Sequence, residues 1–134
     1  MKAGREKINW NEQFKLRISN ADKSRQKHEV IKLLVMMKII EKHKADRVWI
    51  RLYSEFPLEN TGLIPDVYYE NLKEKSVICY EIQKDLSNDY INRKTKEYNN
   101  YEIPFFTVDL IVIPLLDSPD NLTELNTWLD KFIV

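Results

Sequence analysis

The segment LIPDVYYENLKEKSVICYEIQK, residues 63–84, decides the fold that the sequence predicts. Apolar and aromatic residues dominate both ends of this segment, and the polar run at 70–76 between them is typical of a reverse turn. We therefore expect two strands, 63–69 and 77–84, joined as an antiparallel hairpin. The second strand is apolar on both faces in its first half, which predicts a central position in a sheet.

This hairpin brings two acidic residues together. If it closes symmetrically over the turn between Lys73 and Glu74, the numbers of paired residues sum to 147, and Asp66 lies directly across from Glu81. Cross-strand partners have Cβ atoms about 4.5–5.5 Å apart, and like charges there repel unless something neutralises them. Carboxylates with a backbone carbonyl suit Mg²⁺ or Mn²⁺, so we expect a metal site at Asp66, Glu81 and the carbonyl of Ile82. The alternative is an ordinary exposed hairpin with its acids on a solvated face.

Five further elements are predicted around the hairpin. They are a helix from residue 22 to about 45, a strand over 48–56, a helix from 87 or 88 to about 101, a buried strand over 106–113 and an amphipathic helix over 122–132. The last two strands are joined through a helix, so we expect them to lie parallel, whereas the first three form an antiparallel meander. The predicted class is α/β, with a mixed four-stranded sheet and flanking helices.

The composition and the charge distribution limit which functions are possible. With 134 residues, 43% of them hydrophobic, the chain suits one globular domain, which we place at 22–134 after a basic arm or short strand at 1–21. Residues 1–51 contain fourteen basic and six acidic residues, and the remainder contains seven and fifteen. The basic half is either a phosphate-facing surface or a set of exposed helix charges. A single cysteine, Cys79, excludes an internal disulfide and a cysteine-based zinc site, and we expect it to be a small core residue.

The acidic hairpin resembles a known superfamily of nucleases. Ile64-Pro65-Asp66, followed after one hairpin by Glu81-Ile82-Gln83, is similar to the PD-(D/E)xK motif of the restriction-endonuclease-like fold. The order of elements over residues 22–113 matches the core of that fold. The resemblance implies metal-assisted hydrolysis of phosphodiester bonds in DNA, with Asp66 and Glu81 holding Mg²⁺ or Mn²⁺ and the scissile phosphate.

One position departs from the family pattern, because Gln83 stands where the family has a lysine. Subgroups with an ExQ segment are similar, among them competence-associated and archaeal viral or plasmid nuclease-like proteins. Their following helix carries basic residues and a tyrosine, which Arg93, Lys94 and Tyr98 match loosely. The missing charge is supplied either by Lys84, if the strand end turns it inward, or by Lys94 from the next helix.

Other residues receive roles by the same resemblance. Glu29 is either a third carboxylate at the metal or an exposed helix residue, and we expect His28 and His43 to be surface residues rather than ligands. The basic residues expected to hold the nucleic-acid backbone are Lys15, Arg17, Lys23, Arg25, Lys27 and Arg93.

Two other classes of function stay open. An inactive relative that binds nucleic acid without cleavage is one, because the strand lysine is missing. A small structural or regulatory protein that dimerises through apolar surfaces is the other. We expect a homodimer if the chain is a nuclease, since so small a subunit seldom encloses a duplex. The sequence shows neither a membrane span nor a secretory signal, which favours the cytoplasm.

Overall fold

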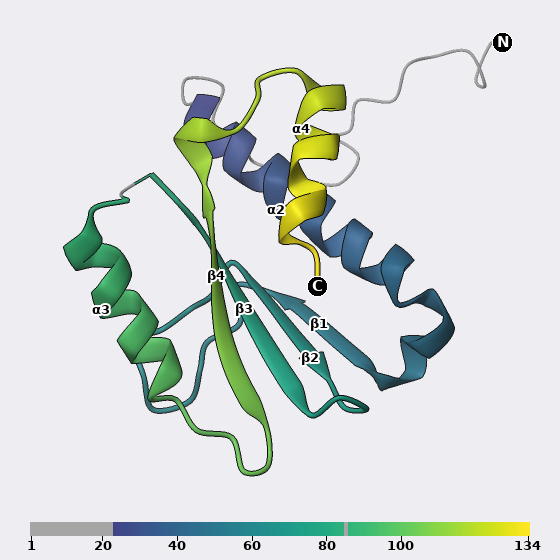
Figure 1. Ribbon diagram of the computed structural model, residues 1–134, viewed down its shortest axis with the longest axis vertical. Coiled ribbons are helices and arrows are strands. Elements are labelled where there is room, and N and C mark those ends of the chain that lie inside the picture. The colour runs from purple at the N-terminus through teal and green to yellow at the C-terminus, as the bar shows by residue number, and fades with distance from the viewer. Residues whose placement is uncertain (1–22, 85) are drawn as a thin grey trace, which may run out of the picture.

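The protein folds around a four-stranded mixed sheet flanked by helices (Figure 1). The computed structural model describes residues 23–84 and 86–134, so the expected arm at 1–21, with Lys15 and Arg17, lies outside the described residues. The strands follow chain order across the sheet. They are β1 (Ile50–Ser54), β2 (Val67–Asn71), β3 (Ser76–Gln83) and β4 (Thr107–Pro114).

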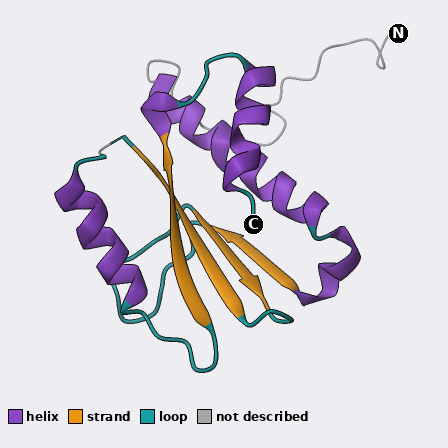
Figure 2. Cartoon of the chain, in the orientation of Figure 1, coloured by secondary structure: helices purple, strands orange, loops and turns teal. Residues whose placement is uncertain are grey.

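Helices cover both faces of this sheet (Figure 2). Their bounds are α2 (Lys23–Lys42), α3 (Asn88–Asn99) and α4 (Leu122–Leu129), with short 3-10 turns η2 (Lys44–Trp49), η3 (Leu115–Asp117) and η4 (Asp130–Phe132). The first three strands pair antiparallel, and β3 and β4 pair parallel across α3. The predicted α/β class, the meander and the crossover are therefore confirmed. The restriction-endonuclease-like core stays a prediction.

The hairpin has the predicted register. Val67 pairs with Tyr80 and Asn71 with Ser76, so paired numbers sum to 147. Asn71 closes the turn, because its Oδ1 accepts the backbone N–H groups of Lys73 and Glu74 at 3.0 and 2.9 Å. Its side-chain amide also donates to the Tyr69 hydroxyl at 3.0 Å.

Two apolar cores lie on opposite faces of the sheet. On one face, α2 buries Ile31, Val35 and Ile39 completely, together with residues of α4. On the other, α3 packs Tyr98 against a cluster that includes Cys79, whose pKa burial raises to about 12. That thiol is an inert core residue, as expected. Between the two cores, β3 is buried along its middle six residues, which confirms its central position.

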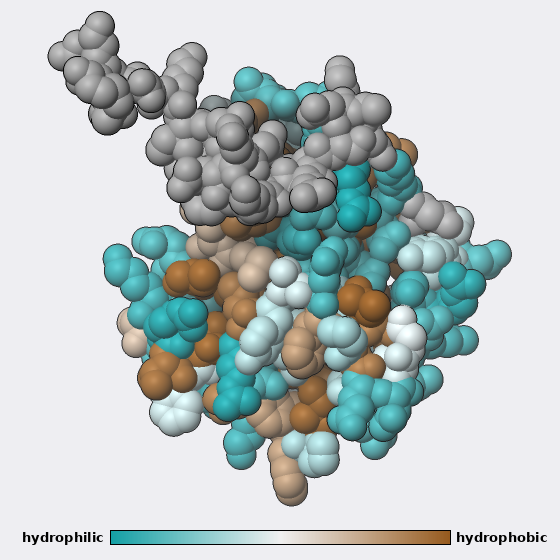
Figure 3. Space-filling view, turned by 180° about the vertical axis from the view of Figure 1, so that it is seen from behind, coloured by the Kyte–Doolittle hydropathy of each residue, from teal (hydrophilic) through white to brown (hydrophobic). Residues whose placement is uncertain are grey.

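The helix α2 is apolar on both sides. Opposite its buried stripe, Leu33 and Met37 are each 56% exposed. Hydrophobic side chains also interrupt the hydrophilic surface seen from behind in Figure 3. Within the described part of the chain, no helix combines the length and apolarity needed to cross a membrane.

Two predicted strand starts and the predicted burial of the last strand are wrong. The first strand begins at Ile50 rather than at residue 48, because the chain after α2 first forms η2, where Val48 is 83% exposed. The second begins at Val67 rather than at residue 63, since Pro65 has no N–H group to donate to a ladder. The last strand, β4, is only partly buried, because it forms an edge of the sheet.

Candidate functional site

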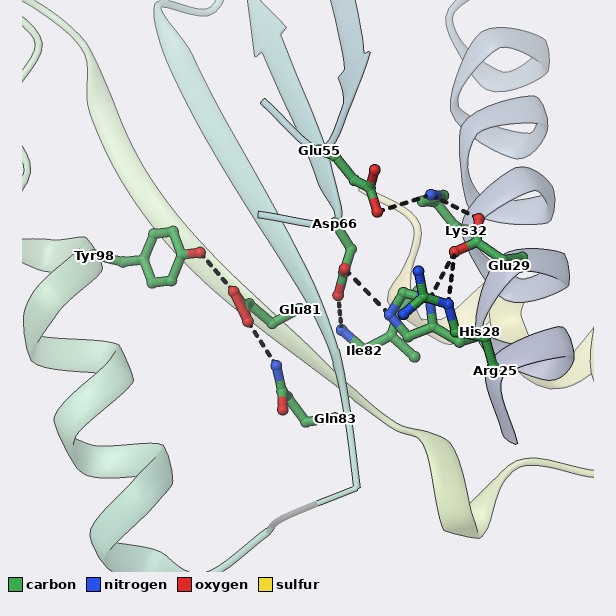
Figure 4. Close-up of polar contacts among 10 residues, drawn as sticks. All are labelled: Arg25, His28, Glu29, Lys32, Glu55, Asp66, Glu81, Ile82, Gln83 and Tyr98. Atoms are coloured by element: carbon green, nitrogen blue, oxygen red, sulfur yellow. Dashed lines mark hydrogen bonds and ion pairs between the residues drawn. The ribbon is translucent and has the colours of Figure 1, made fainter. Parts of the chain in front are cut away.

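Polar side chains gather where β1 and β3 end and β2 begins (Figure 4). Asp66, the residue before β2, is held there from two sides. Its Oδ2 accepts the backbone N–H of Ile82 on β3 at 2.7 Å, and its Oδ1 lies 3.2 Å from Nε2 of His28 on α2. The backbone N–H of Asp66 donates to the Tyr80 carbonyl at 2.9 Å. One carboxylate thus joins the central strand to the long helix.

His28 is the site residue that sequence reasoning missed. Its side chain is only 19% exposed, and the hydrogen bond to Asp66 raises the pKa of the imidazole although burial opposes the shift. The spacing of residues along the helix already indicated that His28 faces the sheet. His28 precedes Ile31 by three residues and Val35 by seven. Residues at that spacing share one helix face, and this face packs on the sheet.

Glu29 lies beside this pair but is engaged elsewhere. Its carboxylate is 2.7 Å from Nζ of Lys32 and 4.0 Å from Nε of Arg25, and its Oε1 is 3.5 Å from Nδ1 of His28. Lys32 also reaches Glu55 at 3.4 Å. Burial lowers the pKa of Lys32, but these two acids outweigh it and leave the pKa raised. Glu29 therefore serves an ion-pair network, and its role as a third metal carboxylate stays a prediction.

Glu81 is a buried carboxylate whose hydrogen-bond donors are both neutral. The Tyr98 hydroxyl donates to its Oε1 at 2.8 Å, and the Gln83 amide donates to its Oε2 at 2.7 Å. Burial raises its pKa, the two donors lower it, and the neighbouring Asp66 carboxylate raises it further. The net shift is upward, so the fold holds this negative charge at a cost.

The two acids do not contact each other as the hairpin register alone suggested. Glu81 points toward α3 and Asp66 toward α2 (Figure 4). The physical reason is that Asp66 follows Pro65 and precedes β2, so strand alternation does not direct its side chain. Over residues 23–84 and 86–134, no three His, Cys, Asp or Glu side chains are grouped to hold a metal ion. The acids remain close enough for Asp66 to affect the pKa of Glu81.

The candidates for the missing lysine lie on either side of the site. Lys84 follows the end of β3 and lines a hollow of about 370 Å³ together with Arg25, His28 and Gln83. Lys94 is on α3, where its positive charge lowers the pKa of Glu81. Neither lysine has a described contact with Asp66 or Glu81. Gln83, in contrast, contacts the site directly, because its amide donates to Oε2 of Glu81.

The expected DNA-binding residues within the described part of the chain differ in how their side chains are engaged. Lys27 is engaged within the protein, because its Nζ donates to the Ser118 carbonyl at 2.6 Å and to Asp120 at 2.8 Å, and its role in holding a phosphate stays a prediction. The side chains of Arg25 and Arg93 are 65% and 64% exposed, each beside a glutamate four residues later. Lys23 is the first residue of α2.

Comparison of the chain with protein-family models, with curated proteins and with solved structures gave no match in any of the three. The geometry at this end of the sheet is therefore what supports a functional assignment.

Proposed function

We propose that the protein is a Mg²⁺- or Mn²⁺-dependent nuclease acting on DNA, with its site at Asp66, Glu81 and His28. The observation that carries the proposal is the buried Glu81 carboxyl group, whose hydrogen-bond donors are both neutral, on the strand whose Ile82 N–H holds Asp66. A bound divalent cation would offset the cost of ionising this buried group. Such an arrangement is typical of functional sites, where ionisable groups have perturbed pKa values.

The donor types fit a hard divalent cation, although they are not gathered around one point. Carboxylates and a backbone carbonyl suit Mg²⁺ or Mn²⁺, whereas an imidazole suits softer metals. Asp66, Glu81 and the Ile82 carbonyl would therefore hold the ion, which would supply Lewis-acid polarisation of a phosphate and a more acidic bound water, and His28 would orient Asp66. Binding would require the Glu81 side chain to leave its neutral donors and turn from α3 toward Asp66.

The chain's own residues supply the rest of the chemistry. Asp66 is oriented by the Ile82 N–H on Oδ2 and by His28 on Oδ1, and both of these residues line the hollow. Lys84 and Arg25 line that hollow and offer positive charge to a phosphate. Gln83 fixes Glu81 by a hydrogen bond instead of donating a strand lysine's charge.

A second candidate is a nucleic-acid-binding protein without cleavage. The observation that favours it is the Gln83 side chain, which occupies Oε2 of Glu81, while neither Lys84 nor Lys94 has a described contact with that carboxylate. Such a protein would keep the cationic hollow and lose the reaction.

The test is cleavage of labelled single-stranded, duplex and branched DNA in Mg²⁺ or Mn²⁺, repeated in EDTA. The wild type is compared with Asp66→Asn and with Asp109→Asn, a matched change of an exposed acid on β4. We expect metal-dependent products from the wild type and Asp109→Asn alone, and a Mn²⁺-dependent rise in melting temperature with the same pattern. Equal cleavage by Asp66→Asn would refute the site, and DNA binding without products would favour the second candidate.

A further inference from the structure

The side of α2 that faces away from the sheet carries an apolar stripe. Its four members are spaced by three, four and three residues along the helix, and they are Val30 (36% exposed), Leu33 (56%), Met37 (56%) and Ile40 (40%). At 3.6 residues per turn, this stripe lies opposite the buried stripe of Ile31, Val35 and Ile39. A helix that is apolar on two opposite sides is typical of one that is covered on both.

The remaining sides of α2 are occupied within the chain. On one flank, Lys27 and Lys38 form ion pairs with residues at the two ends of α4. On the other flank, Lys32 forms an ion pair with Glu55, which follows β1. A third side packs on the sheet. Within residues 23–84 and 86–134, the apolar stripe is therefore the side of α2 that stays exposed.

A hollow of about 700 Å³ adjoins the N-terminal end of this stripe. Val30 belongs to both, and Gln26 lines the hollow one helical turn earlier. Leu116 and Leu122, which are 67% and 62% exposed, line it from η3 and α4. The exposed apolar surface thus continues from α2 onto its two neighbouring elements.

From this surface we infer that two copies of the chain associate through the stripe, with their α2 helices antiparallel about a twofold axis. The spacing of the stripe is that of the a and d positions in a coiled coil. It is the same when followed from either end, so an antiparallel second copy places its Met37 against Leu33 and its Ile40 against Val30. Such self-complementarity is what a twofold interface requires.

The charges of α2 favour the antiparallel direction. Its N-terminal part carries Arg25 and Lys27, with no acidic residue in the first turn, whereas Glu41 directly follows the stripe. A parallel pair would bring the two basic ends together, and like charges repel. An antiparallel pair instead brings Glu41 of each copy to the basic end of the other, and it also aligns the two helix dipoles favourably.

The antiparallel direction also widens the contact beyond one helix. It places Ile40 of the second copy beside Val30, at the edge of the hollow. A standard interface involves about 20–30 residues of each partner, which is more than a single stripe supplies. The exposed Leu116 and Leu122 extend the apolar contact around the hollow. The inference is independent of the proposed function, because His28 lies on another side of α2.

The first test is the molar mass of the full chain in sedimentation equilibrium. We compare the wild type with Leu33→Gln, with Met37→Gln and with Phe105→Gln, and circular dichroism checks that each variant is folded. Phe105 is 90% exposed and precedes β4, so its substitution removes an exposed apolar side chain away from α2.

We expect the wild type and Phe105→Gln to be dimers. Leu33→Gln and Met37→Gln should each raise the dissociation constant at least about a hundredfold, because every dimer contains the change twice. A monomeric wild type would overturn the inference, and so would a dimer whose dissociation constant neither variant raises.

The second test concerns direction and uses a short thiol cross-linker. In an antiparallel pair, Val30 of one copy adjoins Ile40 of the other, whereas the two Val30 residues lie about 15 Å apart along the helix axis. Val30→Cys and Ile40→Cys are therefore treated separately and mixed, with the wild type as control because its Cys79 is buried. We expect a cross-linked dimer from the mixture alone. Cross-linking of either variant by itself, or of none of the samples, would overturn the antiparallel pairing.

Discussion

The two ends of the hairpin each bury a polar side chain, and they do so differently. At the turn, Asn71 is neutral, and its amide makes three hydrogen bonds that close the turn and hold Tyr69. At the open end, Glu81 has both oxygens hydrogen-bonded, yet its charge has only neutral donors and its pKa is raised by burial. Asn71 therefore stabilises the fold, whereas an ionised Glu81 would lower its stability unless a positive charge were bound beside it.

Each end of the hairpin also has a buried polar atom without a hydrogen bond among the described residues. At the open end it is Nδ1 of His28, which has Glu29 3.5 Å away as an ion-pair contact. At the turn end it is Oε2 of Glu70, beside Asn71, which has Nη1 of Arg51 3.6 Å away. The difference between the two ends therefore lies in Asn71 and Glu81 themselves.

Among the substitutions that test this difference between the two ends, Asp66→Asn is expected to have the largest effect. Asp66→Asn preserves the shape and the hydrogen bond from the Ile82 N–H but removes the negative charge. We expect the rate of metal-dependent DNA cleavage to fall at least about a hundredfold, with the melting temperature in EDTA little changed. Single-turnover kinetics and thermal unfolding measure the two quantities. A comparable rate for the variant would show that the open end is not catalytic.

Asn71→Ala is expected to have the next largest effect, on stability alone. It leaves the N–H groups of Lys73 and Glu74 without their acceptor and the Tyr69 hydroxyl without its donor. The free energy of unfolding should fall by about 2 kcal/mol in urea titrations. Asn92→Ala, at an exposed position of α3, is the control and should change it little. If Asn71→Ala folds but no longer cleaves DNA, then the turn end is not purely structural, and the assignment of separate roles to the two ends is wrong.

Glu81→Gln should stabilise the protein in EDTA at neutral pH. The amide keeps a hydrogen-bond acceptor for Tyr98 and removes the buried charge, and Gln83 can present its carbonyl to the new NH₂ group. We expect the free energy of unfolding to rise by about 1 kcal/mol. Because the pKa of Glu81 is raised in the fold, this gain should be full above that raised pKa and shrink as the pH falls toward the ordinary value of 4.5. Destabilisation at pH 7 would contradict our account of Glu81.

The smallest effect is expected at His28 and concerns pH. The folded pKa of His28 lies above its ordinary value of 6.5, so the contact of the charged imidazole with Asp66 stabilises the fold fully below that value. The contribution is lost as the pH rises through the raised pKa. The stability difference between wild type and His28→Gln, measured by denaturation in EDTA, should therefore be larger at about pH 5.5 than at about pH 8.5. A difference independent of pH would show that His28 is neutral throughout.

Much of the fold could be predicted from the local pattern of apolar, polar and turn residues in the sequence. The hairpin register followed from the position of the turn. Once the turn is centred between Lys73 and Glu74, each residue of one strand has a single partner on the other, and a shift by one residue would turn every side chain to the wrong face. The inward stripe of α3 was equally predictable. Ile91, Lys94 and Tyr98 are all at least partly buried, as helical spacing requires.

The direction of a side chain at an element boundary was not accessible in this way. Asp66 lies one residue outside β2, where alternation no longer applies, and its carboxylate is oriented by an N–H group sixteen residues away and by a histidine on α2. Its partnership with His28 depends on how α2 crosses the sheet, and no local period contains that information.

The amino-acid sequence by itself determined which strands pair, in what register, and that two acids lie near one end of the hairpin, because these follow from short-range periodicity and turn chemistry. Only the tertiary structure decided which groups those acids contact. Asp66 turned to α2 and Glu81 to α3, since the packing of two helices on opposite faces of the sheet placed a histidine beside one carboxylate and a tyrosine beside the other.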